Sequence, residues 1–197
     1  MKTTVTGAVT AAKILEAGRQ LIMRRGYNGF SYNDIAEAID IRKASIHHHF
    51  PGKLDLAIAV VQQSRSAFDT DMAGLHASGA DSLAQLRAYI GYWERCIGDD
   101  SAPFCVAGML GAELSTLPDE LAREVKGHFE NVSRWLEGVL EAGVRSGQLT
   151  FSATVRSEAE TLLSLVYGAM LTARAYGGAA LFKSVSQQAV DRLVASA

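Results

Sequence analysis

Side chains that could bind nucleic acid are concentrated in residues 42–49 of the 197-residue chain. Arg42 and Lys43 supply cations, Ser45 supplies a hydroxyl, and residues 47–49 are three consecutive histidines. Carried on one short helix, these groups could bond to phosphate oxygens and to base edges in a DNA major groove. The solvated face of an ordinary amphipathic helix would look similar, so the neighbouring elements must decide between the two interpretations.

The spacing around this stretch is typical of a helix-turn-helix. Ala36, Asp40 and Ile46 provide a small residue where two helices cross, a turn residue, and a buried residue on the second helix. The turn position often needs a positive φ, which Asp tolerates better than most side chains. The second helix, residues 43–49, would then present its polar face to DNA.

Helix-end signals bound the motif on both sides. Ser31 stands three residues before Asp34, as in a capping box that starts a helix. Pro51 and Gly52 end the second short helix, and Lys53 opens a long one. Near that helix N-terminus the Lys53 amine could reach a phosphate beside free backbone N–H groups.

A combination of residues between positions 10 and 56 is more specific than any one of these signals. Its members are Ile14, Leu15, Glu16, Ala17, Arg25, Gly26, Tyr27, Ser31, Asp34, Ile35, Ala36, Ile41, Lys43, Ala44, Ser45, His48, Phe50 and Lys53. In this combination the stretch resembles the DNA-binding domain of TetR-family transcriptional regulators. The chain departs from that family at His47 and His49, where Tyr is common, and at Asp40, where the turn usually has Gly.

The resemblance implies a domain order and a set of partners. A helix-turn-helix DNA-binding domain would span residues 1–52, and a helical signal-sensing and dimerisation domain residues 53–197. A homodimer joined through residues 153–195 would bind a near-palindromic double-stranded DNA operator, most simply as a repressor that a small molecule or an electrophile releases. No cofactor or metal is implied. The residues expected to contact DNA are Ser31, Arg42, Lys43, Ala44, Ser45, His47, His48, His49 and Lys53.

Charge is unevenly distributed along the chain. Residues 1–55 carry eight Lys/Arg and five Asp/Glu, whereas the remainder carries eleven and sixteen, for a net charge of −2 overall. A basic head on an acidic body fits a nucleic-acid reader with a separate sensing domain. The chain has no apolar run long enough for a membrane span and no convincing signal peptide, and two cysteines are expected to be thiols in the cytoplasm.

The apolar pattern predicts an all-α fold of about nine helices. Pro51, Pro103 and Pro118 each stand where a helix should begin, which is the favoured place for proline. A first helix is expected from about residue 8 to 25. The helices expected after residue 76 span residues 81–97, 103–114, 118–145, 153–176 and 179–195.

The last two helices are expected to form the dimer interface. Their apolar residues cover more surface than one buried face requires, which favours a two-fold four-helix bundle between subunits. Packing within a single chain is the alternative. The residues concerned are Leu162, Leu163, Val166, Tyr167, Ala169, Met170, Ala173, Leu181, Phe182, Val185, Ala189, Val190 and Leu193.

The sequence gives little support for metal binding or catalysis. Residues 47–49 cannot all bind one metal ion, because consecutive helical side chains point about 100° apart. Gly-rich phosphate loops, nucleophile elbows, paired metal motifs and a plausible Cys–His pair are missing. A small-molecule-binding helical protein or an enzyme without DNA affinity is nevertheless the rival class.

A ligand pocket is predicted where apolar helix faces of the body should converge. Aromatic residues and Met would wall it, and a few polar groups would orient the ligand. Plain core packing is the alternative for every member. The residues are Trp93, Cys96, Phe104, Cys105, Met109, Trp135, Tyr167, Met170 and Arg174.

Cys105 is a candidate redox residue. If Pro103 starts a helix, Cys105 lies in its first turn, where free N–H groups lower a thiol pKa. Asp99 and Asp100 would act in the opposite direction. The stretch 105–114 resembles the cysteine-bearing segment of the TetR subgroup that senses electrophiles and oxidants, with Cys96 as a conceivable resolving partner. A buried Cys that only packs is the alternative.

Overall fold

The computed structural model describes residues 2–195, with side chains from residue 7 onward, and within this range the chain forms nine α-helices and one short 3-10 turn. The all-α expectation is confirmed, since the described residues hold only an isolated β-bridge, between Leu149 and Val194. Contacts divide the chain into two compact units. The head unit comprises residues up to 66 together with 105–128, and the body unit comprises 67–104 together with 129 onward. The functional boundary expected at residue 52 stays a prediction.

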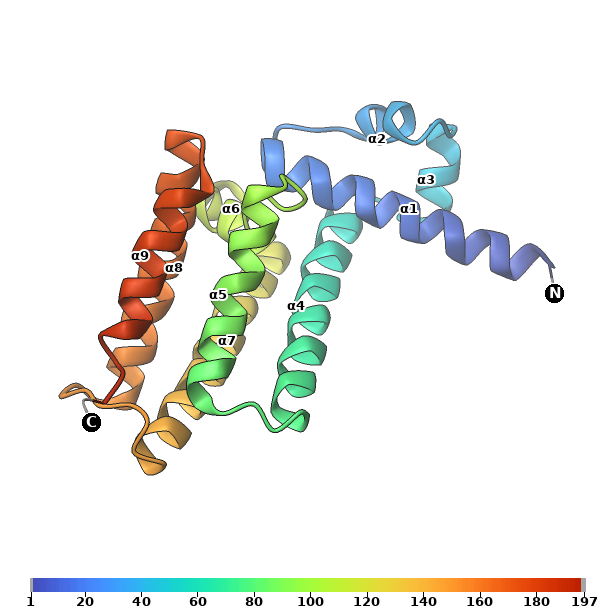
Figure 1. The fold of residues 1–197 in the computed structure, drawn as a ribbon. Helices are drawn as coiled ribbons and strands as arrows, with labels where there is room; N and C mark the ends of the chain where they lie inside the picture. The colour runs from blue at the N-terminus through green and yellow to red at the C-terminus, as the bar shows by residue number, and fades with distance from the viewer. Residues whose placement is uncertain (1, 196–197) are drawn as a thin grey trace. The chain divides into compact units, whose positions relative to one another are not determined.

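The head unit begins with three packed helices and the start of a fourth. Its first helices are α1 (Lys2–Arg25), α2 (Tyr32–Ala38), α3 (Lys43–His49) and the first part of α4 (Lys53–Ala77). Helices α2 and α3 pack on each other and on α1 (Figure 1). A fully buried aliphatic cluster holds them together: Ile14, Ile22, Ile35, Ile46 and Leu56. Gly18 lets α4 approach α1 closely, because a Cβ there would lie only 3.1 Å from Leu56.

The rest of the head unit comes from later in the sequence. It contains α6 (Val106–Ala112), the 3-10 turn η1 (Leu114–Thr116) and the start of α7 (Asp119–Arg145). Helix α6 packs against α1. The expectation that Pro103 begins this helix is wrong: α6 begins at Val106, and Cys105 is its N-cap residue with extended backbone. Pro118, by contrast, immediately precedes α7, and its carbonyl accepts the Ala122 N–H at 3.0 Å.

The body unit is a bundle of long helices. It contains the end of α4, α5 (Ser82–Gly98), most of α7, α8 (Val155–Tyr176) and α9 (Ala179–Asp191). Helix α9 lies alongside both α8 and α5 (Figure 1). Gly177 ends α8 with φ +74°, as a helix-terminating glycine does, and the chain reverses into α9. Buried residues shared among these helices include Leu86, Leu136, Leu162, Met170 and Phe182.

Two further helix ends differ from the sequence prediction. Helix α1 begins at Lys2 and not near residue 8. Helix α9 ends at Asp191, not at 195, because the chain then turns to pair with residues 148–150. There the Thr150 N–H donates to the Leu193 carbonyl at 2.8 Å, and the Ala195 N–H donates to the Gln148 carbonyl at 3.0 Å. Among the described residues no helix is both long and apolar enough to cross a membrane.

Candidate nucleic-acid interface and body cavity

The capping box at the start of α2 is present as predicted. The Ser31 N–H and hydroxyl both donate to the Asp34 carboxylate, at 2.8 and 2.7 Å, and the Asn33 N–H donates back to the Ser31 hydroxyl at 3.2 Å. These hydrogen bonds from Ser31, hydroxyl first, hold the pKa of Asp34 below its usual value. Arg25 adds an ion pair to Asp34 at 2.9 Å. The start of α2 is therefore fixed relative to the end of α1.

The turn between α2 and α3 has the geometry that the spacing predicted. Asp40 has φ +52°, in the left-handed region that Asp tolerates. Ile46 is completely buried on the inner side of α3. The Tyr32 hydroxyl closes the motif by donating to the Phe50 carbonyl at 2.9 Å, and burial, with smaller effects of the Asp55 and Tyr27 charges, raises the pKa of Tyr32 to about 12. Tyr32 therefore remains a neutral donor at any physiological pH.

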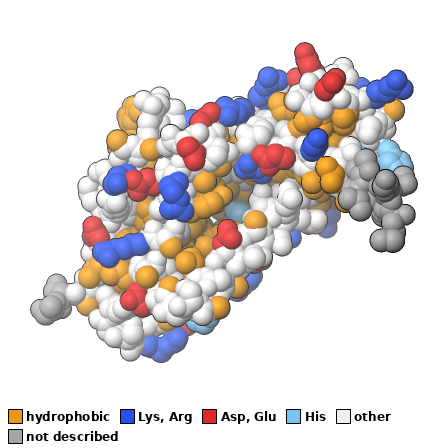
Figure 2. All heavy atoms as spheres, turned by 45° about the vertical axis from the view of Figure 1, so that its right-hand side comes forward, with side chains coloured by type: hydrophobic (Ala, Val, Ile, Leu, Met, Phe, Trp, Pro, Cys, Tyr) orange, Lys and Arg blue, Asp and Glu red, His pale blue; other side chains and the backbone are white. Residues whose placement is uncertain are grey.

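The outer side of α3 carries the residues expected to contact DNA. Arg42, Lys43, Ala44, His47 and His48 are exposed. Arg42 caps α3 through its backbone alone, so its guanidinium is not used in capping. Figure 2 shows histidine side chains gathered at the surface at the α3 end of the head unit. Phosphates and base edges could be reached from this face.

His47 differs from its neighbours in being held in place. Its ring packs edge-on against Tyr32, with centroids 4.9 Å apart, and its Nδ1 lies 3.0 Å from the Pro51 carbonyl oxygen. Because a carbonyl can only accept, this contact assigns a proton to Nδ1. His48 and His49 contact each other at 5.3 Å. The described residues contain no cluster of three or more side chains suited to a metal ion.

Lys53 lies in a different position from the one the sequence suggested. Its ammonium donates to the Phe30 carbonyl and lies 4.8 and 4.4 Å above the rings of Tyr27 and Phe30. Partial burial lowers its pKa from the usual value. The ammonium thus joins α4 to the segment between α1 and α2. This internal bonding weakens the case for a phosphate contact, which stays a prediction.

A corner of the head unit that sequence reasoning missed joins the end of α1 to the end of α6. The Glu113 carboxylate accepts the Tyr27 N–H at 2.8 Å, and the Asn28 amide donates to the Thr116 hydroxyl at 3.2 Å. Gly26 is required there, since it has φ +73° and a Cβ would lie 1.8 Å from the Glu113 carboxylate. No local sequence pattern predicts this contact, because 86 residues separate Glu113 from Tyr27.

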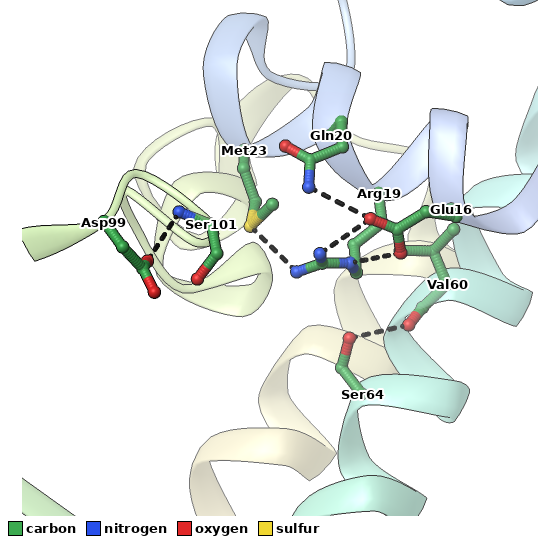
Figure 3. A network of polar contacts seen from close by, with 8 residues as sticks. All are labelled: Glu16, Arg19, Gln20, Met23, Val60, Ser64, Asp99 and Ser101. Carbon is green, nitrogen blue, oxygen red and sulfur yellow. Dashed lines mark hydrogen bonds and ion pairs between the residues drawn. The ribbon is translucent and has the colours of Figure 1, made fainter. Parts of the chain in front are cut away.

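The middle of α1 carries a second polar network, shown in Figure 3. Arg19 donates twice to the Glu16 carboxylate at 2.8 Å, and Gln20 donates to the same carboxylate at 3.0 Å. The hydrogen bond from Arg19 is the largest influence that lowers the pKa of Glu16. A third nitrogen of Arg19 lies 3.5 Å from the Met23 sulfur. These pairs are one helical turn apart, so they stiffen α1.

The residues predicted to wall a ligand pocket fall into several separate contacts. Trp135 packs edge-on against Phe68 and Tyr89, at 5.5 and 5.3 Å. Tyr167 lies against Phe129 at 4.9 Å. Trp93 and Cys96 are half-buried on α5 and Met170 is fully buried, whereas Cys105 and Met109 belong to the head unit. The exposed Arg174 places its guanidinium 5.8 Å from the ring of buried Phe104.

A cavity of about 960 Å³ opens instead among the end of α4, the start of α5 and the second half of α7. Of the nine predicted residues only Trp135 lines it. Sequence reasoning selected large apolar residues, and these mostly fill space. The cavity exists where Ala73, Gly138 and Ala142 leave space unfilled.

The expectation that the chain has no plausible Cys–His pair is wrong, because Cys105 contacts His128, which the sequence did not single out. Its Sγ lies 3.8 Å from the Nε2 of His128, and both side chains are about 95% buried. Neither Cys105 nor Cys96 forms a disulfide. A thiol in contact with an imidazole can pass its proton to that ring, which is the arrangement that activates cysteine nucleophiles.

The predicted dimer stripe is largely internal. Ala169, Met170 and Ala173 are buried by contacts within the same chain, in which α8 packs on α9. The large apolar residues that α8 leaves in solvent are Leu165, Leu171, which is 58% exposed, and Tyr176 at its end.

Comparisons with known proteins agree with this arrangement. Residues 14–60 match the profile described as bacterial regulatory proteins, tetR family, and residues 82–189 match that of a tetracyclin repressor-like C-terminal domain. The HTH-type transcriptional regulator RutR of Escherichia coli K12 is 32% identical over 143 residues, which cover 69% of this chain and 65% of RutR. The HTH-type transcriptional repressor NemR of the same organism is 22% identical and 84% of each chain is covered.

Solved structures of TetR-family regulators are also similar to this chain. A TetR-family regulator from Agrobacterium tumefaciens is 46% identical, with a TM-score of 0.93, over 96% of this chain and all of the other. A TetR regulator from Legionella pneumophila is 29% identical, with a TM-score of 0.83, over 92% of this chain and 95% of the other. Both similarities extend over the head and body units.

Proposed function

The chain belongs to the TetR family of bacterial regulatory proteins, and we propose that it is a homodimeric repressor that an effector releases from a near-palindromic operator. Each subunit inserts α3 into a major groove. Operator half-sites then lie about 34–36 Å apart, or a multiple of this spacing. A protein that works on chromosomal DNA acts in the cytoplasm.

The observation that carries the proposal is the two-sided character of α3. Ile46 is fully buried and anchors the helix, while Lys43, His47 and His48 are exposed on the outside. The turn at Asp40 and the cap at Ser31 fix the helix rigidly enough to read sequence. Lys43 supplies a phosphate contact, and the free Nε2 of His47 is positioned to accept from a base amino group when the ring is neutral.

Dimerisation uses the outer face of α8. Seven exposed residues along it are small or uncharged, which allows two copies of the helix to approach closely: Ser157, Thr161, Ser164, Gly168, Leu171, Thr172 and Ala175. The exposed charges of its first turns, Arg156 and Glu160, form an ion pair with each other. Exposed Leu171 is the apolar centre of this face. Two such helices with their α9 neighbours make a two-fold four-helix bundle.

Release of DNA follows from a shift between two conformers. An effector shifts the equilibrium only by its different affinity for the two conformers. Within the head unit, the contact of Glu113 with Tyr27 ties α6 to the end of α1. A displacement of α6 would therefore pull on the helices that hold α3.

A gel-shift experiment tests the function directly. The purified protein should retard DNA taken from upstream of its own gene, and Lys43→Ala should weaken the complex. Retardation that is absent for wild type, together with turnover of a small molecule, would favour the rival enzyme class.

The pairing of Cys105 with His128 favours a second kind of trigger, covalent addition of an electrophile such as an α,β-unsaturated carbonyl. His128 takes the thiol proton, the sulfur forms a bond to the β-carbon, and the electron pair of the C=C bond moves to the α-carbon, which receives the proton. The adduct would enlarge a closely packed interior at the start of α6, where repacking is the only response.

Titration of the protein–DNA complex with N-ethylmaleimide separates this trigger from a reversible ligand. Release by wild type and by Cys96→Ser, but not by Cys105→Ser, supports the covalent trigger. An equal response of all three proteins would return Cys105 to a packing role.

A further inference from the structure

The body cavity has a chemical character that defines its occupant. One side is an aromatic wall formed by Phe68 and Trp135, whose rings stand at 89° to each other with centroids 5.5 Å apart. The buried ring of Tyr89 contacts both of them, with centroids 6.1 Å from Phe68 and 5.3 Å from Trp135. Phe68 and Trp135 are only half-buried, so part of each ring remains available to a ligand. A flat aromatic molecule gains from edge-to-face and offset contacts with such a wall.

Space beside this wall is created by a glycine on α7. Gly138 lies on the turn after Trp135, lines the cavity, and would place a Cβ in open space with no atom within 4 Å. The cavity volume of about 960 Å³ is ample for a molecule of one to three fused rings.

The charged groups around the cavity indicate which sign of ligand charge it would bind. Its two carboxylates already have donors: Asp69 accepts from the Asn131 amide, and Asp81 accepts the Ala84 N–H at 2.8 Å as the N-cap of α5. That backbone hydrogen bond, followed by one from Gln148, lowers the pKa of Asp81.

The arginines that line the cavity make fewer ion pairs than the carboxylates make hydrogen bonds. Arg145 makes only a 3.6 Å pair with Glu141 at the surface. Arg134, which neighbours Trp135 in the sequence and also lines the cavity, has no ion-pair partner among the residues the structure describes. An unpaired guanidinium beside an aromatic wall suits a carboxylate, to which it can donate two parallel hydrogen bonds.

We propose that this cavity binds an aromatic carboxylate, with the ring system against Phe68 and Trp135 and the carboxylate on Arg134. The inference rests on the proposed function for its consequence, because occupancy is what would favour the DNA-free conformer. The binding step itself requires no DNA and can be measured separately.

Calorimetric titration of the full-length protein tests the site with defined probes. Benzoate, 2-naphthoate and 2-anthroate present one, two and three rings, and 2-naphthamide is the neutral counterpart of 2-naphthoate. At least one acid should bind wild type. The naphthamide should bind about tenfold more weakly than 2-naphthoate, which corresponds to the loss of one charge-assisted hydrogen bond at a partly exposed site.

Three variants locate the binding. Gly138→Phe should fill the cavity and abolish binding of acid and amide, without unfolding the chain, because its Cβ meets no atom. Gly74→Phe is the matched control: Gly74 is also helical with open space around its Cβ, but it does not line the cavity, so affinity should be unchanged. Arg134→Gln should bind the acid and the amide with nearly equal affinity.

The outcomes separate this inference from the proposed function. Failure of all three acids to bind wild type, undiminished binding to Gly138→Phe, or persistent preference of Arg134→Gln for the acid would each overturn the inference, even if operator binding is intact. Binding with the expected variant pattern but no loss of operator affinity would support the site and refute its role in release.

Discussion

The corner formed by Gly26 and Glu113 gives a quantitative test of how the head unit is held together. Replacing Gly26 with Ala forces a side chain into a left-handed backbone conformation, which costs about 1 kcal/mol. The new Cβ also displaces the Glu113 carboxylate, 1.8 Å away, and removes its 2.8 Å hydrogen bond with the Tyr27 N–H. Loss of a hydrogen bond to a charged group in a partly buried site costs about 2 kcal/mol.

These contributions predict non-additive stabilities. Gly26→Ala should lower the free energy of unfolding by about 3 kcal/mol, and Glu113→Ala, which removes only the hydrogen bond, by about 2 kcal/mol. In the double variant the hydrogen bond is lost only once, so the total should be about 3 rather than about 5 kcal/mol. The coupling of about 2 kcal/mol is well above the scatter of independent sites.

Urea unfolding followed by circular dichroism measures all four proteins at one protein concentration, since dimerisation makes apparent stability depend on it. Gly147→Ala is the matched control, because Gly147 has φ +74° but no atom within 4 Å of its Cβ. It should lose only the strain of about 1 kcal/mol and should be additive with Glu113→Ala. If Gly26→Ala costs no more than Gly147→Ala, or if the Gly26 and Glu113 substitutions are additive within about 0.5 kcal/mol, the contact of Glu113 with this corner does not stabilise the fold.

Three further predictions concern the cap, the DNA contact and the dimer. Ser31→Ala should destabilise the head unit by about 1 kcal/mol at neutral pH in thermal unfolding. This difference between variant and wild type should shrink as the pH falls below the usual pKa of Asp34. The pKa of Asp34 is lowered in the fold, so the stabilisation by its carboxylate disappears as that group is protonated. Lys43→Ala should weaken binding to every DNA sequence and reduce the slope of log affinity against log salt by about one unit in anisotropy titrations; an unchanged slope would exclude a phosphate contact. Leu171→Glu should give a folded monomer by light scattering, whereas Met170→Glu, at a fully buried position, should unfold the chain; a dimeric Leu171→Glu variant would contradict the proposed interface.

Local signals in the sequence were sufficient for the head. The 43–49 helix, the cap at Ser31 and the positive φ at Asp40 were all predicted correctly. Each depends on residues within about ten positions of one another, where side-chain type and spacing constrain the backbone directly. The all-α fold followed for a related reason, because helical periodicity is also local.

Features that depend on distant contacts were not predictable. Proline suggested a helix start at Pro103, but Pro103, Phe104 and the N-cap residue Cys105 are not helical, and the helix begins at Val106. Apolarity selected Met170 for the dimer interface, although packing of α8 on α9 buries it inside one chain. His128 and Glu113 gave no signal at all, since their partners lie 23 and 86 residues away.

The body cavity could not be predicted from the sequence either. A pocket is space that side chains leave empty, and a search for large apolar residues finds the side chains that fill space. Gly138 and the alanines near it were informative only once α4, α5 and α7 had been placed beside one another.

The central claim is that a dimer reads DNA through α3. Its most direct test is to incubate the purified protein with sheared genomic DNA and to sequence the fragments that it retains. We expect enrichment of a near-palindrome whose half-sites are centred about 10 base pairs apart or a multiple of that. It also predicts loss of the enrichment when Lys43 and His47 are both replaced by Ala. Retained DNA without a shared motif, or the same motif retained by the double variant, would contradict it.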